Sequence, residues 1–234
     1  YGGDLFFDNM AGFLKTKDYS IILGEQDLGD DSSFSKWGIP DHVLFSHAVR
    51  LADTLPRPFQ LSILTLSNHT PFDLPDSSIR RYFDNDRMST IYNSQLYADW
   101  AIGRFIDQFR ELPVFDSTIF VFTAVHALWD LAQIVLSPAN THFTLLIFAP
   151  RLLGDSGRVI TAYGGQCDLL PTLMGLLGGD YVHESWGRDL LKLPPEDSGF
   201  AIIQHAQRLG YLDHEAFFME ILDHHTSFLA TSRL

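Results

Sequence analysis

Apolar residues recur every three or four positions in several stretches of the chain, which is the spacing of an amphipathic helix. The first stretch covers residues 41–55, where Asp41 is a suitable N-cap and Pro56 closes the segment. Residues 87–112 form the longest stretch, and residues 167–177 form a short one that two glycines follow. The sequence therefore predicts helices over these ranges.

Short apolar runs with β-branched residues alternate with the predicted helices and indicate buried strands. These runs are residues 59–67, 117–124, 143–149 and, late in the chain, 199–204. Apolar strands between helices are typical of an α/β fold in which helices flank a mostly parallel central sheet. In such folds the chemistry lies beyond the carboxyl ends of the strands, so we expect functional side chains next to these runs.

Histidines stand beside three of the predicted strands. His69 follows the first strand, His126 follows the second, and His142 comes just before the third. Three imidazoles that met at one edge of a sheet could bind a divalent metal or a phosphate. The spacing alone does not bring them together, and a single loop histidine is more often exposed or locally hydrogen-bonded. The sequence contains no GxGxxG, P-loop, HExxH or GxSxG motif.

The composition fits a folded domain that does not bind nucleic acid. Hydrophobic residues make up 46% of the 234 positions, and acidic residues outnumber lysine and arginine by 29 to 16. The formal net charge of -13 argues against a nucleic-acid-binding surface. Cys167 is the only cysteine, so no disulfide forms within the chain. The sequence has no apolar run of the roughly 18 residues that span a membrane, and we interpret it as a portion of a longer protein, because its start lacks a Met and a signal peptide.

Seven stretches resemble, in the same order, the landmarks of one protein family. They are YGGDLFFDNMAGF (1–13), LTLSNHTPFDLPD (64–76), YNSQLYADWAIGRFIDQF (92–109), FDSTIFVFTAVHA (115–127), THFTLLIFAPRLL (141–153), QCDLLPTLMGLLG (166–178) and SWGRDLL (185–191). The family is the lipoteichoic acid synthase and phosphoglycerol transferase group, within the alkaline phosphatase and sulfatase superfamily. The resemblance implies that residues 1–204 are a partial sulfatase-like catalytic domain that lacks its N-terminal strands, with residues 205–234 as a C-terminal extension.

The resemblance also implies an activity. The resemblance implies a membrane-anchored enzyme whose catalytic domain faces outside the cytoplasm. In such an enzyme, a threonine beside a divalent metal, often manganese, attacks a phosphodiester head group. The metal lowers the pKa of the nucleophile and neutralises phosphate charge. We therefore expect a phosphodiester head-group substrate, a cell-envelope glycan or lipid acceptor, and no nucleic acid. The longer protein is expected at the extracytoplasmic face of a bacterial membrane, anchored upstream of this chain.

The matching positions imply roles for individual residues. His69 matches a histidine that contacts the substrate phosphate or the leaving group, and His126 matches a metal-binding histidine. Asp4 and His142 match positions that we assign to substrate binding. Asp168 matches a structural landmark, in which a helix packs under the site. No residue matches the nucleophile, so we expect it outside the chain and expect the 234-residue chain to be inactive alone.

Val125 departs from the family pattern, which has an aspartate directly before the metal-binding histidine. A carboxylate supplies negative charge and a hard oxygen ligand, and valine supplies neither. Binding of the divalent metal is therefore expected to be weakened or lost. Three hypotheses stay open. The chain is part of a metal-dependent phosphotransferase or hydrolase, a degenerate, non-catalytic binding domain of the same fold, or a soluble protein that keeps the fold for unrelated structural reasons.

Overall fold

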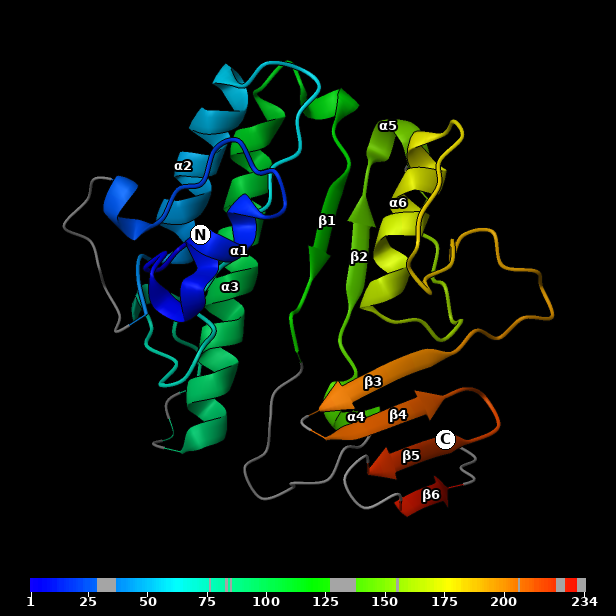
Figure 1. Ribbon diagram of the computed structural model, residues 1–234. Coiled ribbons are helices and arrows are strands. Elements are labelled where there is room, and N and C mark those ends of the chain that lie inside the picture. The colour runs from blue at the N-terminus through cyan, green and yellow to red at the C-terminus, as the bar shows by residue number, and fades with distance from the viewer. Residues whose placement is uncertain are drawn as a thin grey trace. The chain divides into compact units, whose positions relative to one another are not determined.

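The computed structural model describes residues 1–28, 37–75, 77–82, 84, 86–126, 138–154, 156–205, 207–221 and 226–230. The chain divides into two compact units, Tyr1–Thr118 and Ile119–Leu234 (Figure 1). Among the described residues, no helix is both long enough and apolar enough to cross a membrane.

The first unit is built from helices and irregular segments. In chain order its elements are η1 (Phe7–Asn9), α1 (Met10–Lys15), η2 (Glu25–Asp27), α2 (Asp41–Thr54), η3 (Ser77–Ile79), α3 (Arg87–Arg110) and η4 (Phe115–Ser117), where η denotes a 3-10 helix. The two long helices, α2 and α3, confirm the helices predicted over residues 41–55 and 87–112.

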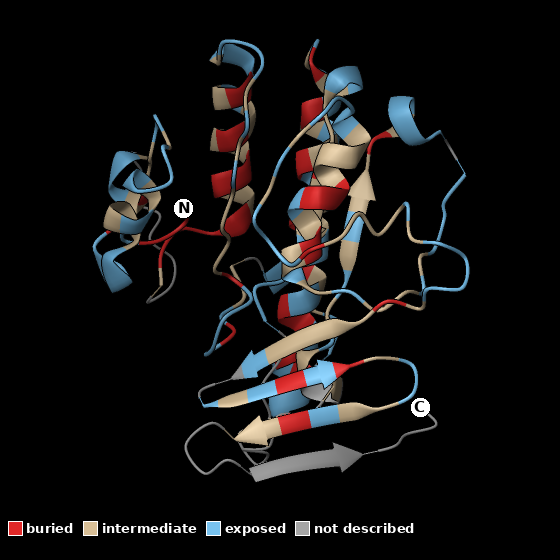
Figure 2. Cartoon of the chain, turned by 45° about the vertical axis from the view of Figure 1, so that its right-hand side comes forward, coloured by how far each residue is buried: buried red, intermediate tan, exposed pale blue. Residues whose placement is uncertain are grey.

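Helices α2 and α3 pack against each other, and Figure 2 shows buried residues along both. The buried apolar residues are Leu44, Phe45, Ala48 and Ala52 on α2, and Ile91, Tyr97, Ala101, Phe105 and Phe109 on α3. The rings of Phe45 and Phe105 stack with their centroids 4.9 Å apart. Fully burying one large apolar side chain stabilises a fold by roughly 1.5–3 kcal/mol, so this helix pair forms the main core of the unit.

The segment predicted as the first strand, residues 59–67, carries no strand pairing. Its backbone contact is with the start of the chain, where the Gly2 amide donates to the Leu64 carbonyl at 3.0 Å. Gly2 in turn accepts the Ile39 amide at 2.9 Å. An apolar run indicates that a segment is buried, whereas a β-strand also needs a ladder of backbone hydrogen bonds to an adjacent strand. The expected burial is partly met here, because most of the segment is half-buried, but the expected strand is absent.

The second unit combines helices and strands. In chain order its elements are β1 (Phe120–Thr123), α4 (Pro138–Thr141), β2 (Leu145–Phe148), α5 (Pro150–Leu153), η5 (Gln166–Asp168), α6 (Leu169–Leu177), β3 (Ala201–His205), β4 (Arg208–Leu212), β5 (Phe217–Ile221) and β6 (Thr226–Ala230). Strands β1, β2 and β3 and helix α6 lie where the sequence predicted them. The mixed α/β class is confirmed.

The strand directions differ from the expected mostly parallel sheet. Strands β1 and β2 pair antiparallel, with Thr123 opposite Leu145. Strands β3 to β6 form an antiparallel meander in sequence order. In the part of the chain that the structure describes, the parallel pairing is the isolated bridge between Tyr163 and Gly199. Continuous apolar runs are typical of parallel strands because both faces of such strands are buried. An antiparallel pair whose two faces are both covered has the same runs, so the runs alone do not fix the direction of the neighbouring strand.

The C-terminal meander alternates buried and exposed residues, as Figure 2 shows for β4 and β5. Gly210, Leu212 and Met219 are buried, whereas Tyr211 and Phe218, which pair across β4 and β5, are exposed. Successive side chains of a strand point to opposite faces, so one face of the meander is covered. The boundary predicted after residue 204 falls within β3, and the predicted extension contains β4, β5 and β6.

Candidate functional site

A tight turn after Leu66 carries the exposed side chain of His69 in the first unit. The His69 amide donates to the Leu66 carbonyl at 3.1 Å, and the Phe72 amide donates to the His69 carbonyl at 2.7 Å. Phe72 is buried and has a φ of 65°, in the left-handed region that non-glycine residues seldom occupy. The turn therefore sends its aromatic side chain inward and its histidine toward solvent.

The His69 imidazole is held on two sides. Its Nδ1 lies 2.9 Å from the Thr70 carbonyl oxygen, and because a carbonyl can only accept, Nδ1 carries a hydrogen. The ring packs on the Trp37 indole with centroids 4.4 Å apart, and Trp37 Nε1 donates to the same Thr70 carbonyl at 2.6 Å. Phe7 packs edge-on against the indole at 5.7 Å. Because Nδ1 carries the hydrogen that bonds the Thr70 carbonyl, Nε2 is the basic nitrogen of the neutral ring.

Two buried side chains tie the histidine turn to the helices. Asp41, at the start of α2, accepts backbone amides of the turn, and Ser94 of α3 donates to Asn68. Asp41 was predicted as the N-cap of α2, but Pro40 takes that position and the Asp41 carboxylate binds the turn instead. Burial raises the pKa of Asp41, although the hydrogen bonds from Ser67 oppose the shift.

Asp4 lies in the same unit, in the segment that leads into η1. Its side chain is exposed, and its Oδ1 accepts the Phe6 amide at 2.9 Å. Gly3, the residue before Asp4, lies close to both Trp37 and Leu66. A Cβ added to Gly3 would lie 2.7 Å from the Trp37 carbonyl and 2.7 Å from Leu66 Cδ1. Asp4 therefore directly follows a residue that contacts Trp37, the residue on whose indole the His69 ring packs.

In the second unit, the two other predicted histidines flank one end of the β1–β2 ladder. Thr123, the last residue of β1, pairs with Leu145, the first residue of β2. His126 lies shortly after Thr123 and His142 shortly before Leu145, and both side chains are exposed. Antiparallel pairing thus brings the two histidine-bearing segments to the same end of the ladder, which parallel pairing would not do.

The turn after β1 is held by Gln166 of η5. Its Nε2 donates to the carbonyls of Ala124 at 3.2 Å and Val125 at 3.1 Å. Val125 stands where the resemblance implies a metal-binding aspartate, and it is 63% exposed. Its isopropyl group has no ligand atom, so the residue before His126 adds nothing to a metal shell.

A buried ion pair fixes η5 and α6 to the segment that follows them. Asp168 is 1% exposed, and its Oδ2 lies 3.2 Å from Arg188 Nη2. Asp168 also accepts the amides of Gly165 at 2.8 Å and Arg188 at 2.6 Å. The Arg188 guanidinium lies over the Phe200 ring at 3.6 Å from its centroid. These contacts give Asp168 the structural role that the resemblance implied.

A metal was also expected at this end of the ladder. The described residues contain no group of three or more His, Cys, Asp or Glu side chains that could hold a metal ion. Divalent metals in proteins generally take at least three protein or substrate ligands. His126 would supply one imidazole, and Val125 supplies no ligand. The described residues therefore do not by themselves fit a divalent metal centre.

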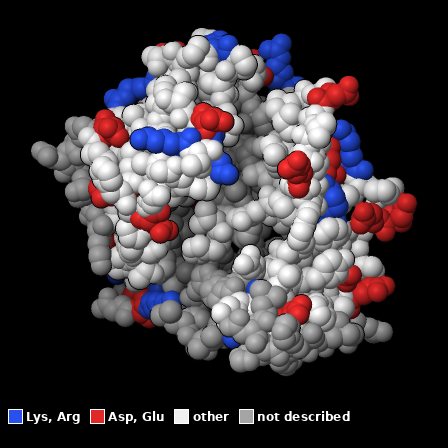
Figure 3. Space-filling model, viewed as in Figure 1, with Lys and Arg blue, Asp and Glu red and all other residues white. Residues whose placement is uncertain are grey.

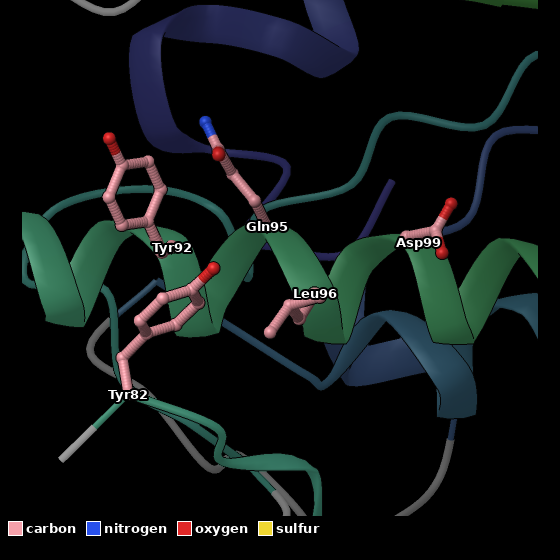
Figure 4. A pocket seen from close by; sticks show the side chains of 5 residues that line it. All are labelled: Tyr82, Tyr92, Gln95, Leu96 and Asp99. Carbon is pink, nitrogen blue, oxygen red and sulfur yellow. The ribbon is translucent and has the colours of Figure 1, made fainter.

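An open depression on α3 is separate from these residues (Figure 4). It is lined by Tyr82, Tyr92, Gln95, Leu96 and Asp99. The two tyrosine rings pack against each other with centroids 5.2 Å apart. None of the histidines or carboxylates predicted for the site lines this depression, so we do not assign it to the site.

Acidic and basic side chains are interspersed on the face shown in Figure 3. Single-sign patches, rather than the sum over the chain, decide where a charged ligand is attracted. The formal net charge of -13 therefore does not prevent a phosphate from binding where histidine or arginine side chains gather.

The sequence did not point to Trp37, Ser94 or Gln166. A signal existed for Ser94, because it falls on the apolar stripe of α3, where a buried hydroxyl needs a partner. No such signal existed for Trp37, whose Thr70 partner is 33 residues away in sequence, or for Gln166, whose partners are 41 and 42 residues away.

Comparison with known proteins places these residues in a family context. A family model described as Sulfatase matches residues 1–179. Lipoteichoic acid synthase 1 of Bacillus subtilis (strain 168) is 25% identical over 182 residues, which cover 72% of this chain and 28% of that protein. The lipoteichoic acid synthase-like protein YvgJ of the same organism is 25% identical over 223 residues, covering 88% of this chain and 33% of that protein. The chain thus spans a third or less of the length of these relatives.

Two solved structures resemble the chain as a whole. A protein in the alkaline phosphatase superfamily from Vibrio parahaemolyticus matches with a TM-score of 0.83 and 25% identity, covering 100% of this chain and 59% of that one. The lipoteichoic acid synthase LtaP from Listeria monocytogenes matches with a TM-score of 0.76 and 19% identity, covering 97% of this chain and 62% of that one. These matches confirm the predicted fold class.

Proposed function

The chain belongs to the sulfatase family, and from this premise we propose that it is part of a phosphotransferase or hydrolase that acts on phosphodiester head groups. The observation that carries the proposal is the His69 turn, because it presents one oriented imidazole to solvent. The similarity to lipoteichoic acid synthases supports transfer of a phosphoglycerol-type group to a cell-envelope acceptor.

His69 has two uses in such a reaction, and both employ Nε2. The protonated ring donates from Nε2 to a phosphate oxygen, as a charge-assisted hydrogen bond, or transfers that proton to the oxygen of the leaving group. The Nδ1–H bond to the Thr70 carbonyl is compatible with both protonation states. It fixes the ring and stabilises the positive charge while Nε2 acts.

Asp4 is proposed to bind the uncharged part of the head group. Its exposed carboxylate accepts one backbone hydrogen bond, from Phe6, and an ionised carboxylate has about four acceptor positions. The remaining capacity suits hydroxyl groups rather than a phosphate anion. His142 is proposed as a further substrate contact at the exposed end of the β1–β2 ladder.

Members of the superfamily generally use divalent metals, and a metal held with the help of residues outside the described ones would supply Lewis-acid chemistry toward the phosphate. His126 is the residue of this chain that we propose as a ligand. The nucleophile is proposed to lie outside the chain. The full protein is proposed to act at the extracytoplasmic face of a bacterial membrane, to which it is anchored upstream of these residues.

The test is an assay of head-group release from phosphodiester substrates by the full-length natural protein, with divalent metals added in turn. His69→Ala should lower kcat/KM by about 10²- to 10⁴-fold, the usual contribution of a positioned general acid. His183→Ala is the matched control, since it removes a half-buried imidazole that bonds Ser185 and has no proposed role. Wild-type turnover in His69→Ala, or no turnover with any metal, would contradict the proposal.

The second candidate function is a non-catalytic binding domain, and Val125 is the observation that favours it. The side chain is 63% exposed, so Val125→Asp adds a carboxylate beside His126 without disturbing a core. Calorimetric titration of the full-length protein with Mn²⁺ separates the candidates. Tighter binding by the variant than by the wild type supports the degenerate domain, and equally tight binding by both refutes it.

A further inference from the structure

The N-terminus of α2 and the histidine turn complete each other's hydrogen bonds. The first amides of a helix have no partner within the helix. In α2 the Asp41 amide donates to Ser67 Oγ at 3.0 Å, and the His42 amide donates to the Tyr97 hydroxyl at 3.3 Å. The caps of this helix therefore come from distant segments, and one of them is the turn itself.

The Asp41 carboxylate in turn accepts hydrogen bonds from the segment that carries Ser67. Its Oδ1 accepts the amides of Leu66 at 3.2 Å and Ser67 at 3.0 Å. Asp41 is 2% exposed, and Ser67 is 8% exposed. Two backbone amides are thus fixed to one oxygen, and that of Ser67 would otherwise be buried without a partner. The chain two residues before the histidine cannot move unless these bonds break.

A second anchor holds the next residue. Ser94 Oγ on α3 donates to Asn68 Oδ1 at 2.6 Å. Ser94 is fully buried, and its hydroxyl also contacts the Ile91 carbonyl at 2.8 Å. Asn68, directly before the histidine, is thereby attached to a different helix from Ser67. Consecutive residues tied to α2 and α3 fix both the position and the direction in which the chain enters the turn.

We propose that Asp41 and Ser94 are positioning residues of His69, which orient its imidazole toward the substrate without touching the substrate themselves. The proposal rests on the proposed function of His69. A catalytic group must be held within about 0.5 Å of its productive position, and a turn on the surface is not held so closely by its own backbone. The two anchors supply the missing restraint from the helix core.

The test compares two serine deletions on one helix of the full-length protein. Ser94→Ala removes the anchor on Asn68, while Ser89→Ala removes another buried α3 hydroxyl, which bonds Asp86 instead. We expect Ser94→Ala to lower kcat by about 10- to 100-fold with little change in KM, because misplacement acts on the transition state. Ser89→Ala should leave both constants unchanged.

Asp41 is tested by a pair of substitutions. Asp41→Asn keeps the Oδ1 acceptor for both amides and should retain kcat, whereas Asp41→Ala removes the acceptor and should lower it as Ser94→Ala does. If Asp41→Ala does not fold, Ser94→Ala decides the question. Equal kcat in Ser94→Ala and Ser89→Ala would overturn the proposal.

A labelling readout separates this proposal from the function of His69. Diethyl pyrocarbonate modifies accessible imidazoles, and peptide mass spectrometry gives the rate at His69 relative to His183. Loosening the turn should weaken the contacts of His69 with Thr70 and Trp37, so modification in Ser94→Ala should be faster. Faster modification with unchanged kcat would show that the anchors hold the turn but that His69 has no role in the reaction, so the proposed function of His69 and the positioning role would both fail. An unchanged modification rate would show that Ser94 does not hold the turn, and would overturn the positioning role alone.

Discussion

Removing the carboxylate of Asp168 should destabilise the second unit more than any surface change. Asp168→Ala leaves the Arg188 guanidinium without its anionic partner, and this arginine side chain is only 20% exposed. It also leaves the amides of Gly165 and Arg188 without their acceptor. Breaking a buried ion pair by removing one partner costs about 3–5 kcal/mol, and the two amides place this site toward the upper end.

The local opening of η5 and α6 is the quantity to measure. Hydrogen–deuterium exchange of the full-length protein, read on peptides that cover residues 163–177 and 185–200, reports the free energy of opening. A loss of about 3 kcal/mol corresponds to exchange roughly two orders of magnitude faster in these peptides. Peptides from α2 and α3 should be unaffected, because they belong to the first unit.

A neighbouring ion pair supplies the control. Lys192 Nζ lies 3.2 Å from Asp189, but the lysine side chain is 68% exposed, so Lys192→Ala should cost no more than about 1 kcal/mol. The double variant Asp168→Ala, Arg188→Ala should recover part of the loss, since it removes the uncompensated cation. If Asp168→Ala destabilises the unit no more than Lys192→Ala does, the Asp168–Arg188 pair does not fix η5 and α6 to the segment that follows them, and the structural role assigned to the pair is refuted.

Three further predictions concern single residues. Burial raises the native pKa of Asp41, so between the ordinary and the raised value the native state binds more protons than the unfolded state, and the free energy of unfolding falls as pH rises. Asp41→Asn should remove that fall in urea titrations from about pH 3 to pH 8; an unchanged slope refutes the assignment. Gly187→Ala should destabilise by several kcal/mol in thermal unfolding, because the new Cβ would overlap the Cys167 carbonyl; near-wild-type stability would contradict the close approach. Burial raises the pKa of Tyr97 to about 12, so spectroscopic titration should find this phenol protonated up to that pH; ionisation near pH 10 would show that the hydroxyl is not buried.

Much of the local structure could be read from the sequence. The helices at residues 41–55, 87–112 and 167–177 were predictable because helical periodicity is a local property of side-chain spacing. The order of motifs led to the family. For the site, His69, His126, His142 and Asp4 were singled out from motifs, and all four lie at exposed positions.

The supporting residues were not predictable, because their partners are distant in sequence. Asp41 follows a proline and precedes an apolar stripe, and by local rules it caps α2. Its carboxylate instead binds amides 25 and 26 residues away. Strand direction was hidden for the same reason, since hydrophobicity measures burial and not pairing. That direction decides that His126 and His142 share one end of a ladder.

The sequence by itself determined the helices, the buried runs and the candidate reactive side chains, because each of these depends on residue type and on neighbours within a few positions. The order of the seven motifs along the chain determined the family. Only the tertiary structure decided how His69 is held. Its ring is fixed by Trp37 and Thr70, and its turn by Asp41 and Ser94. These contacts join segments that the chain brings together only by packing α2 against α3, and no local pattern contains that information.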